Sequence, residues 1–459
     1  MKKMIICSMF VLMSTYPLLA QDYALFIHGF EGSADSWESS DTPELMVEMG
    51  VINDFDLLVY ETEEVAAENG LQSLIQEIAG IMQARGSGRW VLIGHSLGGL
   101  ISRVAYEGLK DLPGIEVSAV ITLGTPHQGA RVAHVSIGYE PGYINAEPYL
   151  DEFIDRVSLP VQNGEFGSLI EWIAGANAIE TLEDLVDVLP QVKDELRVFE
   201  RPSVEYQVKD IIGLNGSFIN LINSDEIADP PNMRSVIGVE KRFAPIRTAA
   251  ELLEDKSGQE LKYLEDFDRL RWFYRANANY FRTLSWLNVR RWFGYDNKNS
   301  RKADRWDDGR TAMDNIDRTW GIMIDSYRLY QTTRMMMVNI CEDGMMPGEG
   351  HEFDPGVPDS AYDGRCWIQQ EVELTFLIPT KNDVLIGPDY AVWNPGEDPE
   401  DDNGVNSFYS DTEPDGGYNH FELRRMKRAY SLEGVFEQGD YAPPMHDATT
   451  WLEELWQNI

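Results

Sequence analysis

The chain has 459 residues, enough for two or three domains of ordinary size and a large buried core. Hydrophobic residues make up 43% of it and charged residues 25%, which is ordinary globular usage and excludes wholesale disorder, collagen-like and coiled-coil architectures. With 38 basic and 77 acidic residues, the formal net charge is −39. Such a surface repels phosphate backbones and anionic lipid headgroups, so nucleic acid is excluded as a partner.

The first twenty residues have the pattern of a signal peptide. Lys2 and Lys3 precede an apolar run that ends at Ala20. A membrane anchor is the alternative, but Ser14 and Pro17 interrupt the run, which is shorter than the roughly 20 apolar residues that span a bilayer. We therefore expect a signal peptide over 1–20, a secreted or periplasmic protein, and no transmembrane segment after its removal.

Two cysteines, Cys341 and Cys366, remain once the signal peptide with Cys7 is removed. In an oxidising compartment a single disulfide between them is the economical prediction. A pair of free, buried cysteines is the alternative.

The first part of the mature chain alternates between strand and helix patterns. Helical spacing of apolar residues at 70–82 and 100–109 separates runs rich in β-formers. This alternation predicts βαβ units and therefore an α/β fold with a mostly parallel sheet. The strand-like runs are 23–27, 55–60, 89–93 and 117–123.

The alternation ends near residue 130, and strand character returns at 372–378. We expect 21–130 to form the first part of the sheet domain and 366–459 its second part. The intervening segment, 131–365, is predicted to be a mainly helical cap inserted into that domain.

Part of this cap, residues 269–310, is locally basic and rich in aromatic residues. It carries eleven Arg and Lys against four Asp, in contrast to the rest of the chain. Its apolar residues approximate one helical face, which predicts a helix packed on a core with its arginines paired to acidic residues. A lid or a wall that binds an acyl chain is the functional alternative.

Gly94-His95-Ser96-Leu97-Gly98 matches the pattern Gly-x-Ser-x-Gly. The run 90–93 leads into it as a strand, and a helical pattern follows from Gly99. A sharp strand-to-helix turn of this kind exposes a nucleophilic serine at its apex. Ser96 is therefore the candidate nucleophile.

A serine nucleophile also needs donors for the oxyanion that forms when it attacks. His28-Gly29-Phe30 stands at the end of the first predicted strand, where the glycine lets the chain turn. We expect the amide of Phe30 to be one donor. The amide of Leu97, next to the nucleophile at a helix N-terminus, would be the other.

The order Ser, acid, His selects the base among seven histidines. Only His351, His420 and His446 lie late enough in the chain. His420 follows a glycine-rich loop and is the preferred base, with His446 as its rival. The acid should follow a late strand, which favours Asp383 over Asp343 and Asp389.

These motifs, together with Gly124-Thr125-Pro126-His127, Asn382-Asp383 and Asn419-His420-Phe421, resemble the secreted bacterial triacylglycerol lipases and related esterases of the α/β-hydrolase superfamily. The resemblance covers 22–130 and 370–430. It implies an α/β-hydrolase fold, a mobile lid, and ester hydrolysis through Ser96, Asp383 and His420. No cofactor is required for that chemistry.

The resemblance also implies a structural calcium ion near the loop that carries the histidine. The expected acidic ligand two residues after His420 is Glu422 here rather than Asp, and the stretch from Asp383 to His420 is longer and more acidic than usual. Two acidic loops, 342–363 and 397–415, hold hard oxygen ligands but lack EF-hand spacing, and such runs are also typical of solvated surface. The metal ligands stay undefined by the sequence.

The sequence therefore predicts a secreted serine hydrolase that cleaves carboxylic esters through an acyl-enzyme, with a neutral lipid as the preferred substrate. A triacylglycerol lipase is the first interpretation. A short-chain or polyester-type carboxylesterase, a GPI-deacylase-like enzyme, an acyltransferase and a catalytically inactive lipid-binding protein are the alternatives. The sequence does not indicate an oligomeric state.

Overall fold

A computed structural model provides the structure of the chain. The signal peptide expected over 1–20, both cysteines and most of the two acidic loops lie outside the part that it describes. The described residues are 21–30, 32–67, 69–136, 144–168, 186, 189–190, 193, 211–213, 215–224, 226–239, 267–287, 298–323, 327–339, 367–379, 406–410, 422–427 and 441–458.

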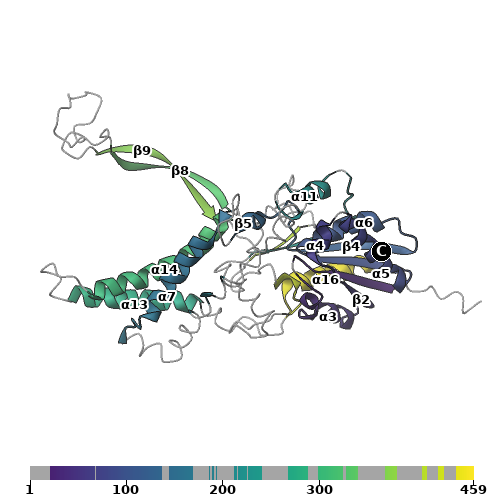
Figure 1. The fold of residues 1–459 in the computed structure, drawn as a ribbon, viewed down its shortest axis with the longest axis horizontal. Helices are drawn as coiled ribbons and strands as arrows, with labels where there is room; N and C mark the ends of the chain where they lie inside the picture. Colours follow the sequence, from purple (N-terminus) through teal and green to yellow (C-terminus); the bar gives the residue numbers. More distant parts are fainter. Residues whose placement is uncertain are drawn as a thin grey trace, which may run out of the picture. The chain divides into compact units, whose positions relative to one another are not determined.

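The main sheet has six strands, and every neighbouring pair in it is parallel. Its order is β10-β7-β4-β3-β1-β2 (Figure 1). The first four strands along the chain come from the alternating segment of the sequence, whereas β7 and β10 come from much later. The strands are β1 (Gln21–Ile27), β2 (Asp54–Leu58), β3 (Gly88–His95), β4 (Ile115–Leu123), β7 (Met233–Val239) and β10 (Asn406–Ser410).

The central strands are apolar because both faces of the sheet are covered. Side chains alternate between the faces: Ala24 and Phe26 of β1 belong to one apolar cluster, and Leu25 and Ile27 belong to the other. All four are fully buried. The apolar runs that predicted strands in the sequence are therefore the two-sided core of a parallel sheet.

Helices lie on both sides of this sheet. On one side are α5 (Gly70–Arg85) and α6 (Leu97–Leu109), and on the other are α3 (Thr42–Glu48) and α16 (Pro443–Asn458) (Figure 1). The predicted α/β fold with a parallel sheet is confirmed. Four shorter helical segments accompany these: α2 (Asp35–Glu38), α4 (Thr62–Ala66), α11 (Ser217–Ile222) and the 3-10 turn η6 (Glu422–Arg424).

The C-terminal helix, α16, closes one face of the sheet. Its apolar side packs in the same cluster as β1 and β3. Near its end the Trp456 indole donates to the Ser118 hydroxyl at 2.9 Å, and the Arg89 guanidinium lies 5.4 Å from the Trp456 ring. The last residues of the chain thus complete a core that the first hundred residues begin.

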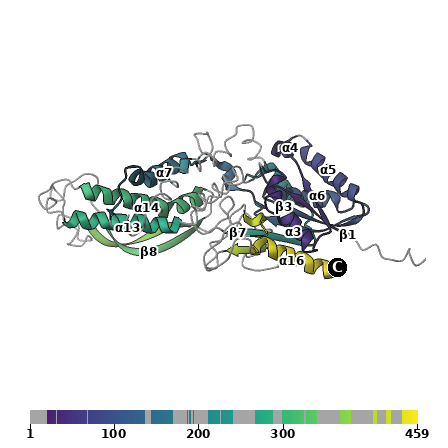
Figure 2. The same ribbon diagram turned by 90° about the horizontal axis from the view of Figure 1, so that it is seen from below.

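Three longer helices form a second group. In it α14 (Lys298–Met323) lies between α7 (Glu147–Gln162) and α13 (Phe267–Leu287) (Figure 2). Their shared core includes Phe273, Tyr274 and Trp306, which are buried and in ring contact. Arginines pair across the helices, as Arg271 does with Asp314 and Arg282 with Asp307. The predicted core-facing aromatic stripe is therefore present, although Leu287 at its end is exposed.

The remaining long strands, β8 (Tyr327–Asn339) and β9 (Trp367–Pro379), pair with each other in an antiparallel ladder. The register runs from Tyr327 opposite Pro379 to Asn339 opposite Trp367. Residues 327–380 form a compact unit separate from the rest of the chain. Two short strands, β5 (Val135–Ser136) and β6 (Ile144–Asn145), make a further parallel pair after the 3-10 turn η1 (Arg131–His134).

The strands after residue 131 differ from the division expected from the sequence. β7 joins the main sheet although it lies within 131–365, where a mainly helical cap is predicted. β9 contains the predicted strand 372–378, but its partner is β8 rather than the main sheet. The physical reason is that an apolar β-rich run indicates a strand without indicating its neighbour.

Candidate functional site

Ser96 lies at a sharp turn between β3 and α6. Its backbone has φ 51° and ψ −121°, a conformation that L-residues rarely adopt and that costs free energy. The turn is held because the Ser96 amide donates to Leu123 O at 2.9 Å and the Gly99 amide donates to Ser96 O at 3.0 Å. Strand, turn and helix therefore have the arrangement that Gly-x-Ser-x-Gly predicts.

The glycines on either side of Ser96 are required by close backbone approach. A Cβ atom added to Gly98 would lie 2.3 Å from Ile27 O and 2.4 Å from His28 O. One added to Gly94 would lie 2.4 Å from the carbonyl carbon of Gly98. Because these neighbours are backbone atoms that cannot move aside cheaply, no side chain fits at either position.

The turn after β1 contacts this elbow. A Cβ on Gly29 would lie 2.9 Å from Ser96 Cβ, so the predicted oxyanion turn and the predicted nucleophile meet. Phe30 follows directly and packs partly buried against the core, while Leu97 is fully buried at the first position of α6. The structure brings together the segments that carry both predicted donor amides, and their role in catalysis stays a prediction.

His28 supports the oxyanion turn from within the core. Its ring is stacked on Tyr60, with centroids 4.1 Å apart and planes 7° from parallel, and the Tyr60 hydroxyl donates to His28 O at 2.8 Å. Nδ1 donates to Gly29 O at 2.9 Å, since a carbonyl can only accept. Burial lowers the pKa of His28. A neutral, fixed imidazole is suited to holding the turn.

His420 itself lies outside the described residues, but the chain on both sides of it is described. β10 runs parallel to β7, so both strands end at the edge of the sheet where β3 leads into Ser96. Ten residues after β10, His420 is followed at two positions by Glu422, the first residue of η6. Two residues of chain span at most about 7 Å. The described neighbours therefore constrain where the predicted base can lie.

The turn η6 is fixed beside the segment that follows the oxyanion turn. The Thr42 hydroxyl donates to Arg424 O at 2.6 Å and accepts from the Met426 amide at 3.0 Å. The Arg424 guanidinium donates to Ser36 O at 2.6 Å, and its charge helps to lower the pKa of His28. These contacts join residues 382 to 388 positions apart in the chain. Sequence analysis did not identify Thr42 or Arg424, and no local pattern points to them.

The predicted acid, Asp383, and its rivals Asp343 and Asp389 lie outside the described residues. The strand that led to the choice of Asp383 is β9, which pairs with β8 in the separate unit 327–380. In the main sheet, the strand between β4 and β10 is β7, which ends at Val239. Glu240 is the next residue in the sequence. Glu240, which sequence analysis did not consider, also lies outside the described residues.

The rival base, His446, lies in the first turn of α16. Its ring is 4.6 Å from that of Tyr441, and Nδ1 is 3.7 Å from Asp447 Oδ1. The other rival, His351, lies outside the described residues. The helix that carries His446 packs on the face of the sheet opposite α6.

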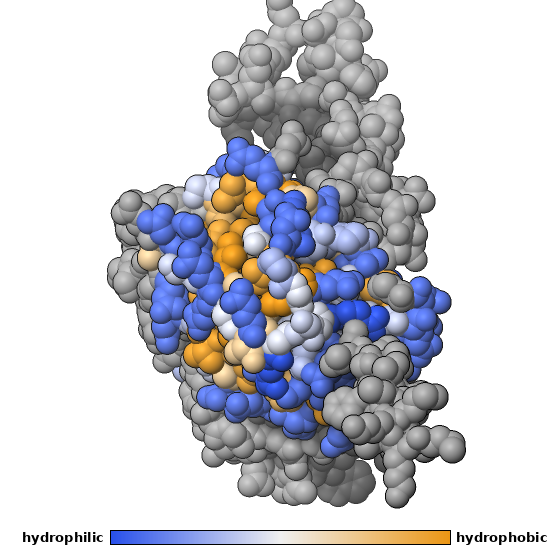
Figure 3. All heavy atoms as spheres, turned by 90° about the vertical axis from the view of Figure 1, so that its right-hand side faces the viewer, coloured by the Kyte–Doolittle hydropathy of each residue, from blue (hydrophilic) through white to orange (hydrophobic). Residues whose placement is uncertain are grey.

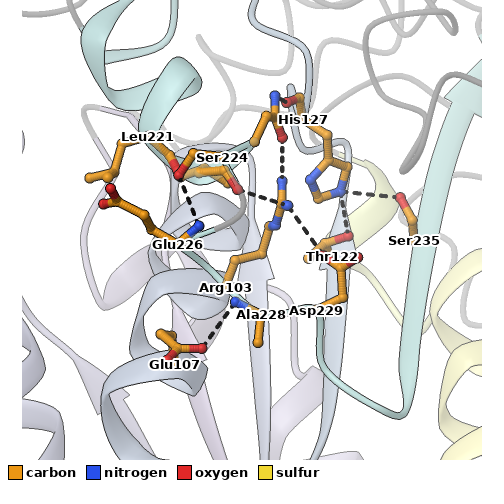
Figure 4. Close-up of polar contacts among 12 residues, drawn as sticks. Arg103, Glu107, Thr122, His127, Leu221, Ser224, Glu226, Ala228, Asp229 and Ser235 are labelled. Carbon is orange, nitrogen blue, oxygen red and sulfur yellow. Dashed lines mark hydrogen bonds and ion pairs between the residues drawn. The ribbon is translucent and has the colours of Figure 1, made fainter.

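A buried polar network ties α6 to the Gly124-Thr125-Pro126-His127 loop (Figure 4). Arg103 of α6 donates to Asn223 Oδ1 at 3.0 Å and to Ile222 O at 3.2 Å, and it lies 3.5 Å from Asp229. Asn223 in turn donates to His127 O at 2.8 Å. Burial lowers the pKa of Arg103 to about 10 despite Asp229. The network fixes the helix that begins at the elbow.

His127 is fully buried in this network. Its Nε2 lies 3.1 Å from Thr122 Oγ1 and 3.4 Å from Ser235 Oγ, which connects β4 to β7 (Figure 4). Burial, together with the charge of Arg103, holds the pKa of His127 well below its usual value. The structure therefore gives His127 a supporting position between β4 and β7.

No group of three or more His, Cys, Asp or Glu in the described part of the chain has the arrangement of a metal site. Glu422, which the resemblance implies as a calcium ligand, is described in η6, but the acidic loops that would supply further oxygens are mostly not. Calcium stays an expectation. None of the described helices is long and apolar enough to cross a membrane.

A parallel sheet with a serine at a strand–turn–helix elbow is the architecture of the α/β-hydrolases. Residues 59–139 match the family model of the PGAP1-like alpha/beta domain. This segment holds β3, the elbow, α6 and β4. The family model therefore places a PGAP1-like α/β domain on the part of the chain that carries Ser96.

Solved structures of several hydrolases are similar to parts of the chain. Phospholipase PlaB from Legionella pneumophila, in complex with thio-NAD, matches with 21% identity and a TM-score of 0.20, over 27% of this chain and 30% of its own. Lipase BlEst2 from Bacillus licheniformis matches with 21% identity and a TM-score of 0.20, over 40% and 65%. A pyrethroid hydrolase from Sphingobium faniae matches with 20% identity and a TM-score of 0.19, over 28% and 50%. No curated protein matches the chain.

Proposed function

We propose that the protein is a serine hydrolase that cleaves carboxylic esters, with Ser96 as the nucleophile. The observation that carries this proposal is the backbone of Ser96. Ser96 is held at φ 51° and ψ −121°, between a buried strand and a helix and against the Gly29 turn, which is the strained geometry of a nucleophile elbow. Strained residues persist where they serve a mechanism.

In the proposed reaction, the hydroxyl oxygen of Ser96 attacks the ester carbonyl carbon as a base takes its proton. The oxyanion receives hydrogen bonds from the amides of Phe30 and Leu97, and the positive end of α6 adds to its stabilisation. Collapse of this intermediate releases the alcohol, which takes the proton from the base. Water, activated by the same base, then releases the acid and restores the serine.

His420 is the proposed base. It follows β10, whose end lies at the same edge of the sheet as the elbow, and it precedes η6, which is anchored to the segment that follows the oxyanion turn. A base in this role needs a fixed position within about 3 Å of the serine oxygen. The anchored turn supports this proposal because Glu422, two residues after His420, lies in a described turn.

The acid that orients this imidazole is proposed from two carboxylates. Asp383 is the one predicted by chain order. Glu240 is favoured by the strand order, because it follows β7, the neighbour of β10 in the main sheet. Chain order Ser, acid, His is satisfied by both.

A neutral lipid ester is the proposed substrate, with triacylglycerol as the first interpretation, and export by the predicted signal peptide is part of the proposal. The supporting feature is the resemblance in the motifs. A short-chain or polyester-type esterase would use the same site. A chain-length series of nitrophenyl esters, with and without emulsion, separates the two: preference for acetate with no gain in emulsion contradicts a lipase. Products formed with an alcohol acceptor would identify an acyltransferase.

Labelling with a fluorophosphonate tests the nucleophile, because only an activated serine reacts with it. We expect the parent protein to be labelled, Ser96→Ala to be unlabelled, and ester hydrolysis to fall by about 10³-fold or more. Ser73→Ala, at an exposed serine of α5, is the matched control and should keep both. An unlabelled parent that is folded by circular dichroism would favour the inactive lipid-binding protein.

A further inference from the structure

One face of α13 carries large apolar side chains that point to solvent. Trp272 is 53% exposed and Trp286 is 67% exposed. They stand 14 positions apart, which is about four turns, so both lie on the same side of the helix. Phe273, Tyr274 and Phe281 occupy the other side and are buried. The exposed indoles are therefore additional to the core of the helix group.

The apolar face ends beside a cluster of cations. The ion pair of Arg282 with Asp307 and the position of Lys302, 5.0 Å from the Phe281 ring, place the start of α14 next to the end of α13. Here Leu287 is 60% exposed. We call this region the helix-end patch, and it consists of Trp286, Leu287, Lys298, Arg301 and Lys302.

The charge of this region is opposite to that of the whole chain. Among the described residues from 286 to 302, three are Lys or Arg and none is acidic, whereas the full chain carries a net charge of −39. Lys298 and Arg301 are exposed on α14. A surface that combines exposed cations with exposed indoles complements an anionic partner that has an apolar interior.

Exposed apolar atoms alone do not define such a surface. Hydrophobic side chains also reach solvent in a band among hydrophilic ones on the face drawn in Figure 3. What distinguishes the helix-end patch is the pairing of indole with positive charge. Trp prefers the boundary between headgroups and acyl chains, and Lys and Arg are attracted to anionic headgroups.

We propose that the helix-end patch binds the surface of an anionic lipid bilayer. The cations would contact headgroups while Trp286 and Leu287 enter the boundary between headgroups and acyl chains. Repulsion by the acidic remainder decays over a Debye length of about 8 Å at physiological salt, so acidic groups farther than this from the contact oppose it only weakly. Such docking would hold an esterase at a lipid surface, and its biological purpose therefore rests on the proposed function.

Co-sedimentation with vesicles tests the docking without catalysis. We would use the full chain with Ser96→Ala, and vesicles of phosphatidylcholine with or without one quarter phosphatidylglycerol, in 0.1 M salt. We expect binding to the anionic vesicles only, and about tenfold weaker binding in 1 M salt, where the Debye length is about 3 Å.

Two double variants separate the contributions of the patch. Trp286→Ser with Leu287→Ser, and Lys298→Gln with Arg301→Gln, should each reduce binding at least tenfold. Tyr149→Ser is the matched control, because Tyr149 is 50% exposed on α7 of the same helix group. The end of α7 lies near the start of α14, because Glu165 contacts Arg305 there. Tyr149 stands about 20 Å along α7 from that end, so this variant should bind like the parent.

Four results would overturn the docking: no binding by the parent, equal binding to both vesicle types, variants that bind like the parent, or loss of binding in Tyr149→Ser. Sedimentation velocity tests whether a second copy of the chain covers the patch instead. Patch variants that dissociate a dimer while leaving vesicle binding unchanged would identify a contact between copies. Fluorophosphonate labelling reports the proposed function separately. If the protein is labelled but does not bind vesicles, only the docking proposal is contradicted. If it binds vesicles but is not labelled, only the hydrolase proposal is contradicted.

Discussion

Two pairs of strands from the second half of the chain differ in length and in the sheet that they join. β8 and β9 are 13 residues each and form a long antiparallel hairpin in a unit of their own. β7 and β10 have only 7 and 5 residues, yet they extend the main parallel sheet. The stronger strand signal thus belongs to the hairpin and the weaker one to the sheet that carries Ser96.

The difference arises from what each pair needs from the rest of the molecule. Long strands close in the chain satisfy one another's backbone groups through a single connection. Short strands are stable only when an existing edge and covering helices accept them, as β4 accepts β7 and β7 accepts β10. A strand's place in the site therefore depends on its neighbours more than on its own length or composition.

The largest expected effect tests whether the chain after β10 supplies the base. We expect His420→Asn to lower ester hydrolysis by about 10³-fold or more, because the serine loses its proton acceptor. His446→Asn, at the start of α16, should stay within about threefold of the parent if it has no part in catalysis. Steady-state rates with a soluble nitrophenyl ester measure both. A large loss in His446→Asn alone would move the base to α16.

The second prediction compares the ends of β7 and β9. If membership of the main sheet decides the acid, Glu240→Gln should lower kcat by about 10²- to 10⁴-fold, since the imidazole loses its orienting charge. Asp383→Asn should then have little effect. Fluorophosphonate labelling rates report the same change without substrate binding. The reverse result would assign the acid to Asp383 and show that chain order is the better guide.

The third prediction concerns the anchor of the segment after His420. Thr42→Val removes a hydroxyl that serves both Arg424 O and the Met426 amide, leaving two buried backbone groups without that partner. We expect the free energy of unfolding to fall by about 1–3 kcal/mol in urea denaturation. Thr42→Ser should restore most of it. Thr283→Val, at an exposed position of α13, is the control and should change stability little.

The smallest effect is a pH dependence from the junction of β4 and β7. Because the folded pKa of His127 lies well below its usual 6.5, the unfolded chain binds a proton below that pH and the folded chain does not. Stability should therefore fall as the pH drops below 6.5, by at most about 1.4 kcal/mol per pH unit. Urea denaturation at pH 7, 6 and 5 would show a smaller slope in His127→Gln. An unchanged slope would mean that other groups cause it.

The sequence predicts the first four strands and the elbow because their signals are local. The apolar run before Gly94 and the helical pattern after Gly99 lie within a few residues of Ser96, and the steric need for Gly98 is visible in the motif itself. The oxyanion turn is found in the same way, at the end of the first strand. Short-range patterns thus specify the elbow that carries Ser96 and the turn that touches it.

The rest of the site depends on contacts between distant residues. Thr42 meets Arg424, and Tyr60 stacks on His28, without any spacing in the sequence that would indicate it. β7 has an ordinary apolar run whose partners lie on both sides of it in space, at β4 and β10. Asp383, His420, the calcium site and the disulfide of Cys341 with Cys366 stay predictions.

The late arrival of β10 has a consequence for biosynthesis. Ser410, the last residue of that strand, follows Val239, the last residue of β7, by 171 positions in the chain. At about 5–20 residues per second, a ribosome needs roughly 10–30 s to add that length. Throughout this interval β7 lacks the strand that pairs with it on one side, and an unpaired strand edge favours aggregation. Expression at a lower temperature, or with chaperones that hold unfolded chains, should therefore raise the yield of soluble protein. The gain should be larger than that from mutations that stabilise the folded core.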